Sequence, residues 1–86
     1  MSHEETDQIT EELTTAVQSV VESFEPYRVE HRPDRTETER WLIWNNKTYE
    51  RLGVIQLDSA NEQSLSLLEK KVLLRTRAMD LLRNAA

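Results

Sequence analysis

Hydrophobic residues recur every three or four positions in two long segments, one near each end of the chain, and this spacing is typical of helices. In the first segment the apolar positions are Ile9, Leu13, Ala16, Val17, Val20, Val21 and Phe24. They fall on one side of a helix. Ser2 and Glu5 have the spacing of a capping box, and Pro26 ends the segment because the residue before a proline avoids the helical conformation. We therefore expect a helix over residues 3–24 with one buried face.

The second helical segment, residues 60–84, is apolar on more than one side. Ser59 and Glu62 have capping-box spacing at its start. One stripe consists of Leu65, Leu68, Val72 and Met79, and a second consists of Leu67, Leu74, Ala78 and Leu81, with Leu82, Lys71 and Arg75 between them. One neighbouring element cannot cover so wide an apolar arc. We expect this helix either to lie between the sheet and the first helix or to offer one face to a partner.

The middle of the chain alternates polar and apolar residues, which is the period of a β-strand. Residues 27–32 follow this alternation, and Pro33-Asp34 marks a turn. Residues 40–44 and 48–52 are rich in aromatic and β-branched residues and flank Asn45-Asn46. This arrangement predicts a hairpin, with a further strand through residues 54–57.

The same middle segment also fits a helix over residues 37–52. Thr36 and Glu39 have capping-box spacing, Gly53 suits a helix end, and Trp41, Trp44, Thr48 and Leu52 recur at helical intervals. We favour the hairpin because asparagine is poor in helix interiors while Trp, Ile, Thr and Tyr favour strands. The predicted fold is a single α+β domain over residues 1–86. Two helices pack on a short antiparallel sheet in the order α-β-β-(β)-α, and the alternative is a three-helix bundle.

Charge is divided unevenly along the chain. Residues 1–27 hold seven acids and no Lys or Arg, while the remainder holds nine acids and all eleven bases, 11 − 9 = +2, so the net charge is −5. A net negative charge disfavours sequence-independent coating of DNA. The chain has no Cys, which excludes disulfides and thiolate metal sites. It has neither a signal-peptide pattern nor an apolar run long enough to span a membrane, so we expect a cytoplasmic protein.

Motifs for catalysis or cofactor binding do not occur in the sequence. His3 and His31 stand alone, without a second ligand-type residue at metal spacing, so we expect no metal site. There is no nucleophile motif and no Gly-rich phosphate loop. Asp58-Ser59 is better explained as a helix cap than as part of a catalytic triad. We therefore expect neither an enzyme nor a bound cofactor.

The surplus apolar surface of the last helix predicts protein binding. We expect a non-enzymatic, small acidic protein-binding module that acts as a homodimer, in the role of a regulator, inhibitor or assembly subunit. Trp residues are enriched at interface hot spots, and Trp44 is expected to lie on the sheet face that the helices leave open. The predicted partner surface is apolar with a charged rim and consists of Trp44, Leu67, Leu74, Leu81, Lys71 and Arg75.

The order helix, strands, helix resembles that of a double-stranded-RNA-binding domain. Residues 26–30 are similar to the start of that family's first strand, and residues 41–47 to its second strand and turn. Lys70-Lys71 begins a stretch similar to its lysine-bearing last helix, but here the two lysines lie inside the helix, and the family's Gly- and Ser-containing loop is missing. The resemblance keeps nucleic-acid binding as the alternative function. The predicted residues for it are Arg40, Lys47, Lys70, Lys71, Arg75 and Arg77.

Overall fold

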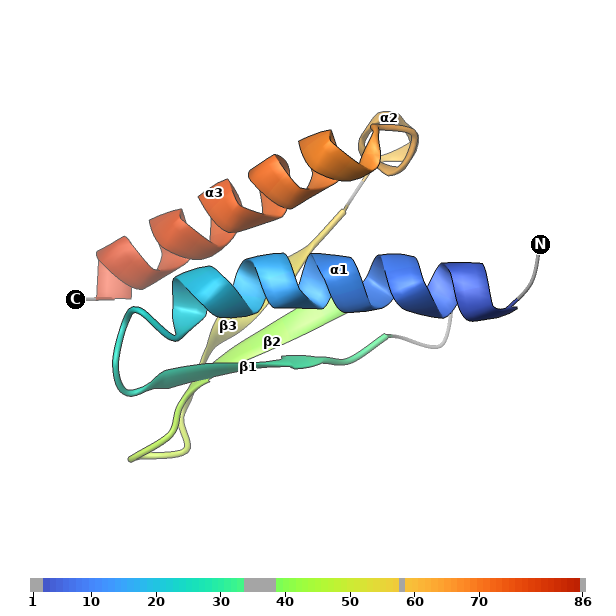
Figure 1. The fold of residues 1–86 in the computed structure, drawn as a ribbon. Coiled ribbons are helices and arrows are strands. Elements are labelled where there is room, and N and C mark those ends of the chain that lie inside the picture. Colours follow the sequence, from blue (N-terminus) through green and yellow to red (C-terminus); the bar gives the residue numbers. More distant parts are fainter. Residues whose placement is uncertain (1–2, 34–38, 58, 86) are drawn as a thin grey trace.

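Two long helices and a three-stranded sheet make up the fold (Figure 1). A computed structural model of the chain describes residues 3–33, 39–57 and 59–85, with the side chains of the first helix from residue 8 onward. The elements in chain order are α1 (His3–Val21), β1 (Tyr27–His31), β2 (Arg40–Asn45), β3 (Arg51–Gln56), α2 (Ala60–Gln63) and α3 (Leu67–Ala85). This order confirms the predicted α+β fold and excludes the three-helix bundle.

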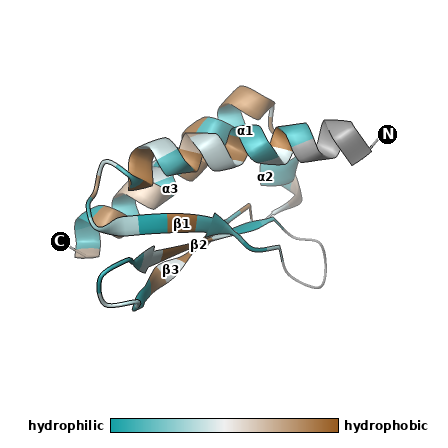
Figure 2. Ribbon diagram, turned by 60° about the horizontal axis from the view of Figure 1, so that its bottom comes forward, coloured by the Kyte–Doolittle hydropathy of each residue, from teal (hydrophilic) through white to brown (hydrophobic). Residues whose placement is uncertain are grey.

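The sheet is antiparallel with the strand order β1-β2-β3, so β2 is central and the other two strands are edges. Trp41 lies opposite His31 on one side and Ile55 on the other. Helices α1 and α3 lie side by side on the same face of the sheet and run in the same direction (Figures 1 and 2). No element within the described ranges covers the opposite face, which we call the open face.

The core lies between this helix pair and the sheet. Trp41 and Ile43 point into it from β2 because alternate residues of a strand share a face. Val17 from α1 and Leu74 from α3 complete the centre, and all four side chains are fully buried. The predicted apolar stripe of the first helix is therefore the face that packs in the core.

Helix α1 ends at Val21, three residues before the predicted end. The chain then turns through hydrogen bonds from Phe24 N to Val21 O, 3.0 Å, and from Tyr27 N to Phe24 O, 2.9 Å. Phe24 still packs against the core, so its apolar spacing reflects burial rather than helix. The predicted Ser2 cap and Asp34 of the predicted turn lie outside the described residues.

The hairpin is confirmed, but its second strand begins later than predicted. Asn45 Oδ1 accepts hydrogen bonds from Lys47 N and Thr48 N, 2.8 and 3.1 Å, which holds the turn. Tyr49 follows with a φ of 62°. The strand predicted at residues 48–52 starts at Arg51 and runs on to Gln56, so the further strand predicted at residues 54–57 is the same strand.

The long helix predicted over residues 60–84 is interrupted at residues 64–66. Ser59 caps α2 as predicted, since its hydroxyl accepts a hydrogen bond from Glu62 N, 3.1 Å. A second cap then starts α3: Glu69 N donates to Ser66 Oγ, 3.2 Å, and Ser66 N donates to Glu69 Oε1, 3.3 Å. This reciprocal pair is a capping box, and it begins the second helix one turn after the first ends.

Candidate binding surfaces

The apolar residues predicted to form one partner surface do not lie together. Leu74 is fully buried, and Leu67 and Leu81 are half-buried against the core. Trp44 lies across the sheet from them, on the open face. The physical reason is the rotation of α3, which turns its second apolar stripe toward the sheet. Leu74 consequently has no exposed surface with which to contact a partner, and it belongs to the core.

Two residues of the first apolar stripe, Leu68 and Val72, face outward instead, while Met79 packs partly against the core. Leu68 is 71% exposed and Val72 is 53% exposed. A groove of about 260 Å³ begins at Val72 on this outer face. Its lining residues are Val72, Arg75, Thr76, Met79, Asp80 and Arg83. The outer face of α3 is thus apolar along one line and charged beside it, and of the predicted partner residues only Arg75 lines this groove.

Two of the predicted cations are held in contacts within the fold. Lys71 Nζ lies 3.5 Å from Glu12 Oε1 and links α3 to α1. The Arg77 guanidinium contacts both carboxylate oxygens of Glu62, at 2.9 and 2.5 Å, and donates to Gln56 O at 2.6 Å. These contacts tie the helices to each other and to the end of β3.

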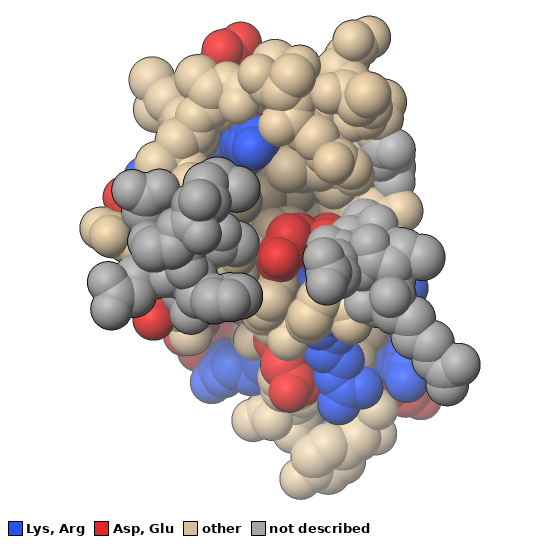
Figure 3. Space-filling view, turned by 90° about the vertical axis from the view of Figure 1, so that its right-hand side faces the viewer, with Lys and Arg blue, Asp and Glu red and all other residues tan. Residues whose placement is uncertain are grey.

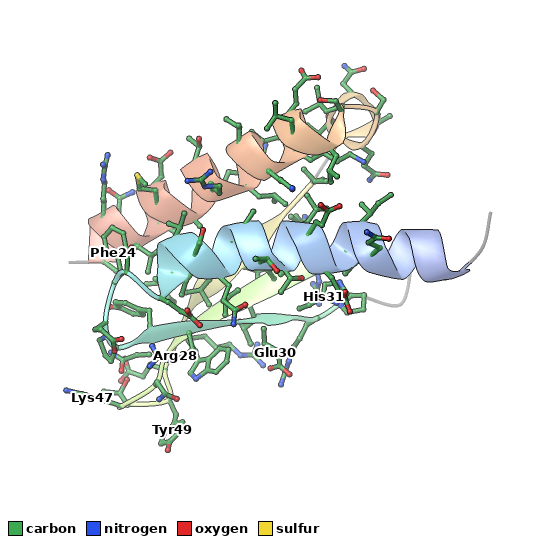
Figure 4. All side chains as sticks on the ribbon, viewed as in Figure 1. Phe24, Arg28, Glu30, His31, Lys47 and Tyr49 are labelled. Carbon is green, nitrogen blue, oxygen red and sulfur yellow. The ribbon has the colours of Figure 1, made fainter. Side chains whose placement is uncertain are left out.

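The cations predicted for nucleic-acid binding are spread over separate places. Arg40 belongs to β2 and reaches the open face, whereas Lys47 lies at the hairpin turn (Figure 4). The others lie on α3, where Lys70 is half-buried and Arg75 is exposed. The structure therefore does not bring this set together on one surface.

The open face of the sheet gathers basic side chains around an apolar centre. Arg28 and Glu30 project from β1 on this side, away from the helices (Figure 4). In Figure 3, Lys and Arg gather in the lower part of the molecule, on the side of the sheet away from the helices. The arginines of this face are Arg28, Arg32, Arg40 and Arg51, and its apolar residues are Leu42, Trp44 and Val54.

Three of these four arginines were not among the predicted site residues. The signal that identifies them is the strand alternation from Arg28 to Arg32, combined with the register that places Arg51 opposite Trp44. Leu42 also lies on this face but is only 8% exposed. It lines a small hollow together with arginine side chains, whose long stems can cover an apolar residue.

A larger groove of about 520 Å³ runs between β3 and α3. Ile55 and Leu81 contribute apolar surface to it, and Asp80 and Asn84 contribute polar groups. Arg77 also lines it and bonds the carbonyl at the end of β3. The groove thus joins the free edge of the sheet to one side of α3.

A polar cluster lies where β1 ends and β2 begins, and it includes a residue of α1. His31 Nε2 contacts the Glu39 carboxylate, and the His31 ring lies 5.4 Å from the Trp41 ring. The Trp41 indole N–H donates to Thr14 Oγ1, 2.8 Å. The cluster contains one carboxylate and one imidazole. Its hydroxyl, that of Thr14, already bonds Trp41 and Thr10 and is not available as a nucleophile. Among the residues that the structure describes, no three His, Asp or Glu side chains are placed to hold a metal ion.

No protein family, curated protein or solved structure matches this chain. In the described part of the chain, every helix is too short or too polar to cross a membrane. Two surfaces stand out on geometry and charge. One is the outer face of α3 with Leu68 and Val72, and the other is the open face of the sheet with its four arginines.

Proposed function

We propose that this chain is a non-enzymatic protein-binding module that associates through the outer face of α3, first of all with a second copy of itself. Such a module would act as a regulator, an inhibitor or an assembly subunit. The observation that carries the proposal is the pair of exposed apolar residues Leu68 and Val72, which lie one turn apart on a helix already packed on its other side.

The spacing of the outer residues supports a helix as the partner. Leu68, Val72, Arg75 and Met79 follow the d-a-d-a spacing of a coiled coil, in which each apolar residue inserts between residues of the facing helix. In an antiparallel pair, a positions face d positions, so Leu68 meets Met79 of the second copy. A parallel pair would place two copies of Arg75 against each other. Like charges repel, so the antiparallel arrangement is favoured.

Sedimentation equilibrium tests this proposal. The wild-type chain should form a dimer at about 10 to 100 µM, and Val72→Asp should raise the dimer dissociation constant at least tenfold because it places a charge in the apolar contact. Tyr49→Asp is the matched control. Tyr49 is 78% exposed and lies at the hairpin turn, far from the outer face of α3, so this variant should dimerise like the wild type.

The result that would overturn the proposal is equally direct. A wild-type chain that remains monomeric at about 1 mM has no self-association of useful strength. Equal weakening by the Tyr49 and Val72 variants would show that added negative charge, rather than loss of the α3 contact, separates the copies. Circular dichroism of each variant establishes that the fold is retained.

A further inference from the structure

The open face of the sheet holds a small hollow with arginine walls. Its volume is about 70 Å³, and its lining residues are Arg32, Arg40, Leu42, Arg51 and Val54. A hollow of this size holds several water molecules, since one water needs roughly 10 to 15 Å³ of such space. It therefore has room for one tetrahedral oxyanion and not for a whole nucleoside.

The strand register explains why the three arginines meet. Arg32 N donates to Arg40 O at 2.7 Å, so these residues are neighbours across β1 and β2. Arg51 starts from the other end of the sheet, opposite Trp44. Its side chain lines the same hollow as Leu42 and the other two arginines. Arg32 and Arg40 thus line the hollow from one end of the sheet, and Arg51 lines it from the other end.

Among the described residues, two of these guanidinium groups have no acidic side chain paired with them. Arg40 Nε is buried and has no hydrogen-bond partner among the residues that the structure describes. Over the described ranges, the exposed side chain of Arg51 makes neither a hydrogen bond nor an ion pair. Arg32 Nε is paired with Glu30 Oε2 at 3.1 Å. The described lining holds three arginines and Glu30 pairs with one of them, so these four groups sum to 3 − 1 = +2.

This arrangement favours an anionic ligand. Like charges opposite each other on adjacent strands repel, and a buried N–H without an acceptor loses its hydration without replacement. A doubly charged oxyanion removes both costs, because it neutralises the excess charge and supplies acceptor oxygens. Guanidinium groups match such oxygens in geometry and form short charge-assisted hydrogen bonds with them.

We propose that this hollow binds a phosphate group, with Arg40 and Arg51 donating to its oxygens and Arg32 supplying further positive charge. The site does not depend on the proposed contact of α3, which lies on the other side of the molecule. The phosphate belongs either to a small phosphate compound or to the backbone of a single-stranded nucleic acid. In the second case half-buried Trp44, next to Arg51, offers a ring for base stacking.

Titration with inorganic phosphate at constant ionic strength tests the site, with the arginine Nε–Hε signals read by NMR. We expect a saturable shift of the Arg40 signal. Arg51→Gln should weaken binding about tenfold or more, the effect of losing one charge-assisted hydrogen bond. Arg83→Gln is the matched control, because it removes the same charge from an exposed arginine on α3, and it should change the affinity less than twofold.

A second titration distinguishes the two sources of phosphate. A single-stranded oligonucleotide of about ten thymidines is long enough for a strand-binding surface of this kind. Tighter binding than inorganic phosphate, lost in Arg51→Gln, identifies a nucleic-acid strand as the ligand. Binding of inorganic phosphate alone identifies a small phosphate compound.

Arg40→Lys keeps the charge but removes the Nε–H, and it should also weaken binding. If that variant does not fold, Arg51→Gln still decides the question.

Two results would overturn the proposal. The first is that neither inorganic phosphate nor the oligonucleotide shifts the Arg40 signal. The second is that Arg51→Gln and Arg83→Gln weaken binding equally, which would mean that anions respond to total charge and not to this hollow.

Discussion

Trp41 joins the sheet to the first helix through one polar contact inside an apolar core. Its side chain is fully buried, and its indole N–H reaches Thr14 Oγ1 at 2.8 Å. Thr14 in turn donates to Thr10 O, 2.8 Å, so a single hydroxyl serves both groups. A buried indole N–H needs an acceptor, and this need aligns α1 on the sheet.

Replacing Thr14 by valine should lower the free energy of unfolding by about 1 to 2 kcal/mol, because the buried indole N–H then lacks an acceptor. Urea unfolding measures the change. Thr15→Val is the matched control: Thr15 makes the same type of bond to Glu11 O, 2.8 Å, but is exposed and has no tryptophan partner. Its effect should stay within about 0.5 kcal/mol. Equal losses for both variants would contradict the role of Trp41.

Tyr49 holds a backbone conformation that suits few residues. Its φ of 62° lies in the left-handed region, which costs a bulky residue about 1 to 2 kcal/mol. Because its side chain is largely exposed, Tyr49→Asn should raise the free energy of unfolding by about 0.5 to 1 kcal/mol, since asparagine tolerates this region. Thermal unfolding checks the gain. Tyr49→Ala should give none, and a similar gain from alanine would point to the lost ring instead of the backbone.

At the scale of elements, local sequence patterns located the helical and extended segments but not all of their boundaries. The hairpin could be predicted because Asn45 occupies a position where its side chain stabilises the turn. The interruption at residues 64–66 was missed, although Ser66 and Glu69 have the same capping-box spacing as Ser59 and Glu62. Two caps seven residues apart indicate two helices, and the apolar periodicity across them concealed the boundary.

Ser66→Ala should lower the free energy of unfolding by about 1 kcal/mol, because it removes the acceptor for Glu69 N at the start of α3. Ser19→Ala is a suitable comparison. Ser19 lies within α1, is exposed, and bonds Ala16 O, so alanine there should be neutral or slightly stabilising. Guanidinium unfolding of the two variants separates the effects. No difference between them would show that the capping box contributes nothing.

The orientation of α3 could not be predicted from its sequence. With two apolar stripes on one helix, periodicity does not decide which one faces the core. Leu74 packs between the layers while Leu68 points outward, and this choice depends on the shape of the sheet opposite. For the same reason the predicted partner residues were drawn largely from the buried stripe. The arginines of the open face were missed because they converge only once the strands are paired.

At the scale of the whole molecule, α3 packs closely on the sheet at Gly53. A Cβ atom at this position would lie 3.0 Å from Leu81 Cδ2 and 3.2 Å from Cδ1. The β-bulge between β2 and β3 lies beside it, where the register shifts after Ile43. The absence of a side chain at Gly53 thus sets how closely α3 approaches the sheet.

Gly53→Val should lower the free energy of unfolding by about 1 to 3 kcal/mol, the usual effect of overpacking. Leu81→Ala alone should also destabilise, but the double variant should be more stable than the sum of the two losses predicts, because the removed leucine leaves room for valine. Urea unfolding of the four proteins gives the coupling energy. Strict additivity would mean that the two residues do not compete for space.

The position of the acidic first segment in the fold also becomes clear at this scale. Helix α1 lies within the segment that contains no Lys or Arg, and its apolar face supplies Leu13, Val17, Val20 and Val21 to the core. Glu12 finds its partner on α3, in Lys71. The uneven charge along the chain therefore becomes, in part, an attraction between the two helices that lie side by side.

A sheet of three strands with both helices on one face leaves two strand edges open, and such edges can recruit strands from other molecules. In this chain each edge carries its own protection against fibril-like stacking. Arg28 and Glu30 place charges along β1, and Arg77 donates a hydrogen bond to the Gln56 carbonyl at the end of β3. Addition of strands from other copies at either edge of the sheet is consequently disfavoured.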